Sequence, residues 1–313
     1  MRLHEDRPSF RQLLGELNSR TGCRSDILEK DYYVCLLLEE LTKSADGAHA
    51  YFKGGTALYK ALRSIRRFSE DIDLTVDVSD CPNPSQAKKR LEGAVLNFHS
   101  LGACLEKDSR KGSVTCVYRY APVTNLLPDA LQRFGKVKVE GTSFTISKPH
   151  ERLSIVPYLF EISSPSEKKA LTEAYDVSPF ELPTISLERI FLDKVFAAEF
   201  YFLRGDYFDV AKHVYDLSVL LNERKIRDFL ENRERLVEVL AFEREESLAR
   251  KGGIASWVRV SDFTVFERLE SSAEFKKDFS QMQRTYVFKR EDFLSLSDVF
   301  NALEQISSLL KGL

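Results

Sequence analysis

The sequence predicts a mixed α/β (α+β) fold over residues 1–183, followed by an α-helical bundle over residues 184–313. Strand-like and helix-like patterns alternate as far as residue 142. Prolines then interrupt a loop-rich stretch, residues 143–183, and from Thr184 apolar residues recur at helical spacing. Because apolar periodicity is the main sequence signal of secondary structure, we predict two domains joined near residue 184.

Composition limits the class of protein. A chain of 313 residues is long enough for one large domain or two, and 43% hydrophobic residues support a sizeable core. The 46 basic and 48 acidic residues give a formal net charge of −2, which disfavours a strongly basic nucleic-acid binder but permits local patches. The N-terminus lacks a signal-peptide pattern, and no apolar run approaches the roughly 20 residues of a membrane span. We therefore expect a cytoplasmic protein that contacts no membrane.

The five cysteines show no C-x-x-C pair, and their number is odd. This pattern predicts reduced thiols, and it argues against a zinc site or a disulfide framework. The cysteines are Cys23, Cys35, Cys81, Cys104 and Cys116.

Two helices are predicted before the first strand. The first covers residues 8–20 and ends at Gly22. The second starts near Asp26, with Glu29 placed to complete a capping-box-like start. Within it, the phrase EKDYYV, residues 29–34, indicates a helix of the core.

A strand, a tight turn, a short helix and a second strand are predicted between Tyr51 and Val78. Gly54 and Gly55 form the turn, where glycine lets the main chain approach a ligand closely. Thr56 then opens the helix. A helix N-terminus presents free N–H groups and positive partial charge, so this turn is a candidate phosphate cradle.

The second strand carries a D-x-D pair. From Ile72 apolar and polar residues alternate, which places Asp71 and Asp73 on the polar face. Side chains two apart in a strand share a face, roughly 6.6 Å apart at ~3.3 Å rise per residue. They can hold one divalent cation, or two ions about 3.5–4 Å apart. In isolation a Gly-Gly pair is usually a turn and a D-x-D pair is usually solvated charge, but together they predict a phosphate cradle beside a metal site.

The two motifs also carry a family resemblance. GGTALYK, residues 54–60, followed by RFSEDIDL, residues 67–74, resembles the nucleotidyltransferases of the AbiEii/AbiGii toxin group. That group is related to the polymerase-β superfamily and includes the MenT-type toxins. The resemblance implies transfer of a nucleoside monophosphate from an NTP, with release of pyrophosphate. It also implies two Mg²⁺ (or Mn²⁺) ions, and a Ser69 that lies at the metal site.

A third carboxylate is expected on a neighbouring strand, because two-metal nucleotidyl transfer usually needs one. After a helix over residues 85–101, strands are predicted at 103–107, 113–120 and 135–142. In the last of them Glu140 shares a face with Lys136 and Lys138. Glu140 would bind metal or accept the attacking hydroxyl's proton, and the alternative is an edge-strand charge.

In the C-terminal part, one helix is predicted to begin at Ser186, its N-cap, and further helices are predicted over about 206–222, 224–251, 270–283 and 292–311. LERIFLDKVFA, residues 187–197, and AKHVYDLSVLL, residues 211–221, again resemble the family. The resemblance implies that Lys194 neutralises triphosphate charge, that Asp216 orients Lys194 or the nucleotide, and that the helical domain completes the active-site cleft. The alternative is a helix–helix salt bridge of little stabilising effect at a surface.

Four basic residues lie between the two N-terminal motifs. Lys60, Arg63, Arg66 and Arg67 suit the end of a helix, where positive charge complements the helix dipole. They are alternatively contacts for the phosphates of an RNA.

We therefore predict a nucleotidyltransferase toxin that modifies RNA, with the 3′ acceptor end of tRNA as acceptor and a cognate antitoxin as partner. The resemblance also implies a role in phage defence. The alternatives are nucleotidylation of a protein or a small molecule, and a non-catalytic nucleotide-binding or partner-binding module. The expected catalytic residues are Asp71, Asp73, Glu140, Lys194 and Asp216. The expected metal ligands are Asp71, Asp73 and Glu140. The expected nucleotide-binding residues are Gly54, Gly55, Thr56, Ser69 and Lys194.

Overall fold

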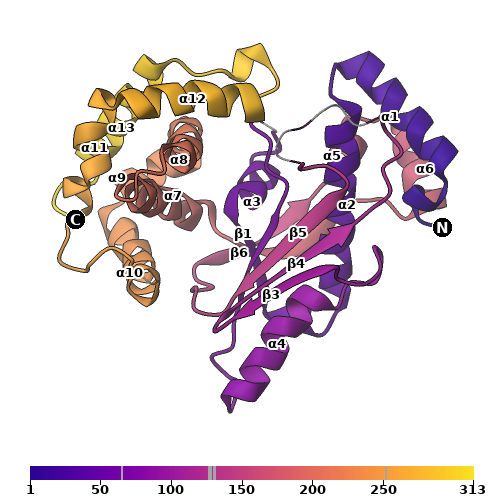
Figure 1. The fold of residues 1–313 in the computed structure, drawn as a ribbon, viewed down its shortest axis with the longest axis horizontal. Helices are drawn as coiled ribbons and strands as arrows, with labels where there is room; N and C mark the ends of the chain where they lie inside the picture. Colours follow the sequence, from indigo (N-terminus) through magenta and orange to yellow (C-terminus); the bar gives the residue numbers. More distant parts are fainter. Residues whose placement is uncertain (65, 126–128, 130–131, 251) are drawn as a thin grey trace. The chain divides into compact units, whose positions relative to one another are not determined.

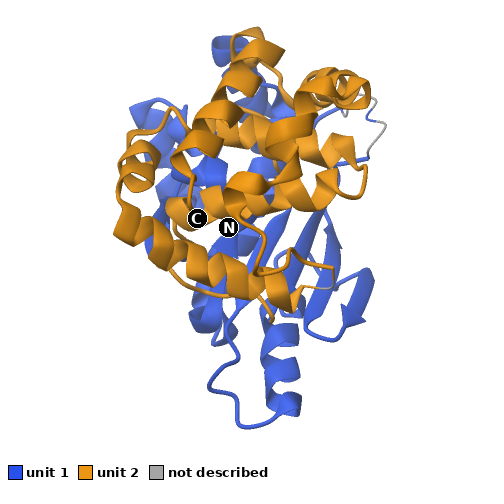
Figure 2. Ribbon diagram, turned by 90° about the vertical axis from the view of Figure 1, so that its left-hand side faces the viewer, with its two compact units in different colours: residues 1–64, 70–143, 151–184 blue, residues 65–69, 144–150, 185–313 orange. Residues whose placement is uncertain are grey.

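The computed structural model of the chain confirms the mixed α/β fold (Figure 1). It describes residues 1–64, 66–125, 129, 132–250 and 252–313. The chain forms two compact units (Figure 2). Unit 1 contains residues 1–64, 70–143 and 151–184, and unit 2 contains residues 65–69, 144–150 and 185–313. Two short segments from the first part of the chain thus belong with the C-terminal helices.

Unit 1 is built around a mixed sheet. In the described residues its strands have the order β3-β4-β5-β2-β1-β7-β6. The strands are β1 (Ala50–Lys53), β2 (Ile72–Val76), β3 (Glu106–Arg110), β4 (Ser113–Arg119), β5 (Lys136–Thr142), β6 (His150–Ile155) and β7 (Phe180–Ile185). β5 pairs with β4 on one side and with β2 on the other, the latter in parallel. The alternative that Glu140 is an edge-strand charge is therefore wrong.

Helix α4 (Pro84–Leu96) packs against β4 and β5. The Tyr118 hydroxyl donates a hydrogen bond to the Val95 carbonyl at 2.7 Å. A Cβ on Gly141 would lie 2.6 Å from Val95 Cγ2, so the glycine permits the close approach of helix and strand. Because side chains alternate along a strand, Lys138 and Glu140 lie on the opposite face of β5.

Helices α1 (Arg7–Thr21) and α2 (Ser25–Lys43) begin the chain, and α2 is the core helix that the sequence predicts. The capping role of Glu29 is wrong. Its buried carboxylate instead accepts hydrogen bonds from the N–H groups of Val123 and Thr124, at 2.6 and 3.2 Å. This partner loop lies far along the chain, so local spacing does not reveal it.

The stretch expected to be loop-rich, residues 143–183, contains regular elements. Besides β6 and β7 it forms α5 (Tyr158–Glu161) and α6 (Pro165–Tyr175). Pro165 is the first residue of α6, and Ser164 and Glu167 form its capping box. Proline marks the start of a helix here because the first turn needs no N–H donor from that residue. The strand predicted at residues 103–107 begins three residues later in the chain, as β3. The side chains of β3 are exposed and polar, so no alternation of apolar residues marks its position.

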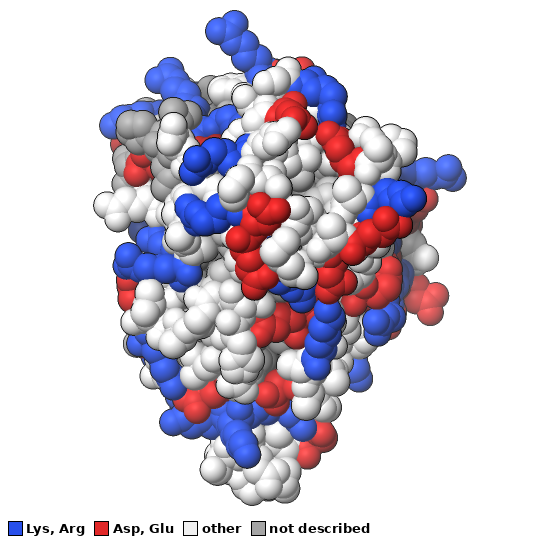
Figure 3. All heavy atoms as spheres, turned by 90° about the vertical axis from the view of Figure 1, so that its right-hand side faces the viewer, with Lys and Arg blue, Asp and Glu red and all other residues white. Residues whose placement is uncertain are grey.

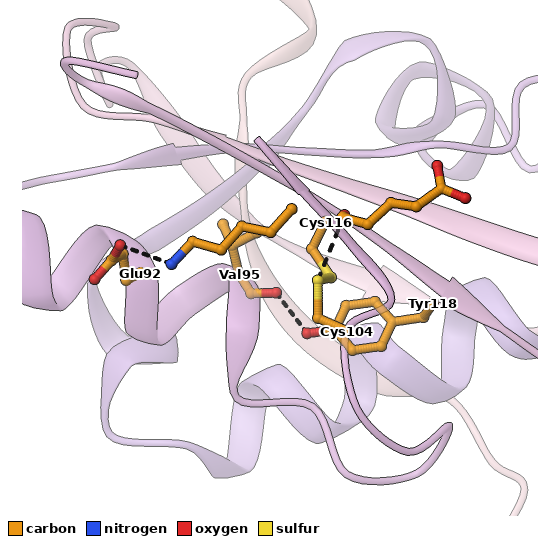
Figure 4. Close-up of a disulfide and its surroundings, with 7 residues drawn as sticks. Glu92, Val95, Cys104, Cys116 and Tyr118 are labelled. Carbon is orange, nitrogen blue, oxygen red and sulfur yellow. Dashed lines mark hydrogen bonds and ion pairs between the residues drawn. A yellow bond between two sulfur atoms is a disulfide. The ribbon is translucent and has the colours of Figure 1, made fainter. Parts of the chain in front are cut away.

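Cys104 and Cys116 form a disulfide beside the β3–β4 hairpin (Figure 4). Their Cα atoms are 5.9 Å apart, within the usual range for a disulfide. The prediction of reduced thiols throughout is therefore wrong for this pair. The antiparallel register, which places Lys107 opposite Cys116, brings the two cysteines together, and the spacing of cysteines alone does not show that register. Among the described residues, the cysteines outside this disulfide are Cys23, Cys35 and Cys81.

Unit 2 consists mainly of helices. They are α7 (Leu187–Phe202), α8 (Tyr207–Leu220), α9 (Arg224–Glu231), α10 (Arg233–Ala249), α11 (Thr264–Arg268), α12 (Ala273–Tyr286) and α13 (Leu296–Leu309). Ser186 caps α7 by accepting a hydrogen bond from the Arg189 N–H, as predicted. The single helix expected over 224–251 is two helices, because Asn232 ends α9 and caps α10.

The charged residues show no dominance of one sign. On the face drawn in Figure 3, basic and acidic side chains are interspersed, as the near balance of 46 and 48 residues leads one to expect. No helix in the described ranges is long and apolar enough to cross a membrane.

Candidate active site

The first part of the candidate site is the N-terminus of α3 (Gly54–Ala61). The sequence predicted that the helix starts at Thr56, but it begins two residues earlier, at Gly54. Gly54 has φ = +80°, and a Cβ at this position would overlap the carboxylate of Asp73. Only glycine meets both requirements at low cost. The helix therefore begins directly beside Asp73, with Gly55 and Thr56 buried in its first turn.

Three carboxylates come from the polar side of β2 and β5. Asp73 lies in β2, Glu140 is its direct neighbour in β5, and Asp71 immediately precedes β2. We call Asp71, Asp73 and Glu140 the strand-face carboxylates. Burial, together with the charges of Asp71 and Glu140, raises the pKa of Asp73 to about 6, against the opposing effect of Lys53 and Lys138. Asp71 and Glu140 thus lie close enough to Asp73 to disfavour its ionisation.

Lys138 supplies a positive charge within this group. Its Nζ is 3.0 Å from Asp71 Oδ2 and 3.9 Å from Glu140 Oε2. Burial alone would lower the pKa of Lys138, but the attraction of Asp71, Asp73 and Glu140 outweighs burial and raises it. Sequence reasoning placed Lys138 on the correct face of the strand but gave it no role. The signal was available, because a lysine two residues before Glu140 must share its side of β5.

The chemistry of this group fits a divalent cation. In the part of the chain that the structure describes, no set of three or more His, Cys, Asp or Glu side chains converges on a metal position. The oxygens of Asp71 and Glu140 instead face the Lys138 ammonium. Carboxylate oxygens are nevertheless the ligands that Mg²⁺ and Mn²⁺ prefer, and the negative charges of Asp71 and Glu140 beside Asp73 favour a bound cation.

Helix α3 is fixed to the core of unit 1 by a buried ion pair. Lys60 Nζ lies 2.6 Å from Asp31 Oδ1 and donates a hydrogen bond to the Val156 carbonyl at 3.0 Å. Burial opposes the charge of Lys60, but Asp31 raises its pKa above the ordinary value. Lys60 therefore has a structural role, through an ion pair with Asp31 that the sequence analysis did not predict.

The second part of the candidate site lies in unit 2. Arg67 donates to both carboxylate oxygens of Asp216, at 2.7 and 2.6 Å, and Lys194 Nζ lies 3.1 Å from Asp216 Oδ2. We call Arg67, Lys194 and Asp216 the buried ion-pair cluster, since the Asp216 side chain is 0% exposed and both cations 6%. Lys194 and Asp216 do form a helix–helix salt bridge, but not at the surface. Arg67 was missed as a partner because 149 residues separate it from Asp216.

The neighbours of this cluster have packing roles, as expected. Burial lowers the pKa of His213 well below its ordinary value, and the charge of Lys194 lowers it further, so His213 is neutral near pH 7. Its ring stacks on Tyr201, with centroids 5.4 Å apart. The Tyr215 hydroxyl donates to the Asp292 carbonyl at 2.6 Å.

The segment that carries Arg67 is anchored in unit 2 on both sides. Arg66 forms an ion pair with Asp292 at 3.0 Å, and the Phe68 N–H donates to the Tyr286 carbonyl at 2.7 Å. Ser69, partly buried, ends this segment. Of the predicted residues, unit 1 contains Gly54, Gly55, Thr56, Asp71, Asp73 and Glu140, and unit 2 contains Ser69, Lys194 and Asp216.

Comparisons with known proteins identify the family of the chain. The model of a family described as nucleotidyl transferase AbiEii toxin, type IV TA system, matches residues 36–305. Among solved structures, the chain is similar to MenT4, a nucleotidyltransferase toxin from Mycobacterium tuberculosis H37Rv, at 16% identity and a TM-score of 0.46. That similarity covers 96% of this chain and 99% of the MenT4 chain. No curated protein matches the sequence.

Proposed function

Because the chain belongs to the AbiEii family of nucleotidyl transferase toxins of type IV toxin–antitoxin systems, we propose that it transfers a nucleoside monophosphate from an NTP to an acceptor and releases pyrophosphate. The observation that carries this proposal is the position of Asp73. It faces Glu140 across two paired strands and lies beside the first turn of α3. Carboxylates next to an anion-binding helix N-terminus suit a nucleotide with its metal.

The residues of the chain have distinct roles in this proposal. The N–H groups in the first turn of α3, at Gly55 and Thr56, point toward the N-terminal end of the helix and bind the β- and γ-phosphates. Gly54 keeps the helix close to Asp73, because any side chain there would collide with the carboxylate. Lys194 offsets negative charge that develops on the departing pyrophosphate, and Asp216 orients Lys194.

The strand-face carboxylates would hold one or two divalent cations, Mg²⁺ or Mn²⁺. When bound, such cations supply Lewis-acid activation of the attacking hydroxyl and neutralise phosphate charge. Asp73 must lose its proton to act as a ligand, and its pKa of about 6 allows that at neutral pH. Glu140 lies close enough to Asp73 in register to serve as a ligand or to accept the proton of the hydroxyl.

RNA is the first acceptor to test, specifically the 3′ acceptor end of tRNA. This choice follows from the resemblance of the GGTALYK and RFSEDIDL motifs to a group that contains tRNA-modifying toxins. Nucleotidylation of a protein or of a small molecule is the alternative reaction. An antitoxin is the expected protein partner, since the family is described as part of toxin–antitoxin systems.

Labelling distinguishes these reactions. Purified protein is incubated with each of the four α-labelled NTPs, total RNA and cell protein, with Asp71→Asn as the inactive control. Label that nuclease removes and protease does not supports RNA transfer, whereas the opposite pattern supports protein transfer. NTP binding without any transferred label, in wild type as in Asp71→Asn, would show a non-catalytic module and refute the proposal.

A further inference from the structure

We propose that Lys138 is a built-in counter-ion of the strand-face carboxylates, and that a divalent cation must displace it in order to bind. The lysine then sets the metal affinity of the nucleotide-free protein. This inference rests on the proposed function, because it takes Asp71, Asp73 and Glu140 to be the metal ligands.

The geometry makes lysine and metal mutually exclusive. The ammonium of Lys138 lies 3.0 Å from one oxygen of Asp71 and 3.9 Å from one oxygen of Glu140. A divalent cation shared by the same two carboxylates needs those oxygens at about 2.0–2.1 Å for Mg²⁺. The Lys138 ammonium and a divalent cation cannot occupy the position between these oxygens at the same time. The ammonium therefore lowers the apparent affinity of the site for the cation.

The position of Lys138 also permits displacement. Its side chain is 39% exposed, as are those of Asp71 and Glu140, so the ammonium can leave for solvent without opening the core. Lysine suits this role because its charge sits on a flexible four-carbon stem. Lys30 provides a contrast, since it is 1% exposed and is fixed by hydrogen bonds to the carbonyls of Arg133 and Lys136.

Charge favours the exchange. When the strand-face carboxylates are all ionised they carry three negative charges, and Lys138 offsets one of them. A divalent cation offsets two, so the exchange improves the local balance and also releases a lysine into water. Removal of the lysine charge leaves the same ligands without a competitor, and metal binding to the nucleotide-free protein becomes tighter.

The experiment is a titration of the nucleotide-free protein with Mn²⁺, followed by the electron paramagnetic resonance signal of the free ion. The variants are Lys138→Met, Lys138→Arg and the matched control Lys136→Met, which removes the same charge from the same face of β5, two residues away. We expect Lys138→Met to bind Mn²⁺ about three- to tenfold more tightly than wild type, the effect of one partly exposed ion pair. Lys138→Arg and Lys136→Met should stay within about twofold of wild type, since both keep a cation at position 138.

The outcomes separate this inference from the proposed function. Unchanged or weaker Mn²⁺ binding by a folded Lys138→Met protein overturns the counter-ion role. If Asp71→Asn abolishes the Mn²⁺ binding of the otherwise wild-type protein in that case, the metal site of the proposed function still stands. Equal gains in Lys138→Met and Lys136→Met also overturn it, because they would reflect net charge alone. If neither wild type nor Lys138→Met binds Mn²⁺ in a way that depends on Asp71, both the inference and the metal site of the proposed function are wrong.

Discussion

Replacement of Lys194 by methionine tests whether unit 2 takes part in the reaction. Lys194 is buried and contacts Asp216 at 3.1 Å, but Asp216 also receives two hydrogen bonds from Arg67, at 2.7 and 2.6 Å. In Lys194→Met the carboxylate therefore keeps its bidentate partner, and methionine fills most of the space of the lysine stem. The fold should tolerate this change.

The expected magnitudes follow from these contacts. Loss of one charged contact on a carboxylate that keeps another costs about 1–2 kcal/mol, or roughly 1.5–3 °C in melting temperature for a chain of 313 residues. Asp216→Asn is different, because it leaves Arg67 and Lys194 buried without their counter-charge, at a cost of about 3–5 kcal/mol. The sequence alone suggested, as the alternative, a surface salt bridge that contributes less than about 1 kcal/mol to stability. Because the pair is buried, its loss is expected to cost more.

The assay measures turnover with labelled NTP and melting temperature on the same samples, with Lys212→Met as control. Lys212 lies in α8 and pairs with Asp209 in its own helix, outside the buried ion-pair cluster. If Lys194 offsets charge in the transition state, turnover of Lys194→Met falls by about 10²–10³. Turnover within about threefold of wild type would refute the role of Lys194, because a purely structural pair affects melting alone.

Three further predictions concern unit 1. Asp71→Asn and Asp73→Asn should each abolish nucleotide transfer and leave the melting temperature nearly unchanged; near wild-type transfer at saturating Mg²⁺ would contradict the two-metal assignment. Gly54→Ala should lower both stability and NTP affinity, because the new Cβ strains a residue at φ = +80° and collides with Asp73. Gly55→Val should weaken NTP binding at the phosphate cradle. Unchanged NTP affinity of a folded Gly55→Val protein in calorimetry would argue against the cradle. Burial lowers the pKa of Lys30 to about 8, so above that pH the unfolded chain binds more protons than the folded one. The free energy of unfolding should then rise by roughly 3 kcal/mol as pH increases from 8 to 10.4, a rise that urea titration should find in wild type and that Lys30→Met should lack.

The fold was predictable where local patterns govern it. The helices of unit 2 follow apolar periodicity and caps such as Ser186, and β2 and β5 follow strict alternation. The prediction failed where distant partners decide the structure. Glu29 has the spacing of a capping box, but a loop near Val123 competes for its carboxylate. β3 has no apolar alternation, because it lies at the edge of the sheet with both faces exposed, and only its pairing with β4 makes it a strand.

The candidate site shows the same division more sharply. Asp71, Asp73 and Gly54 are close in sequence, so a motif reports them together, and the structure adds the reason that Gly54 must be glycine. Arg67 belongs to the same motif, yet its partner Asp216 is 149 residues away. The sequence therefore suggested that Arg67 complements a helix dipole or contacts RNA, while its guanidinium in fact binds Asp216 within the protein. A basic residue in a nucleotidyltransferase motif is thus no proof of a nucleic-acid contact until its counter-charge has been located.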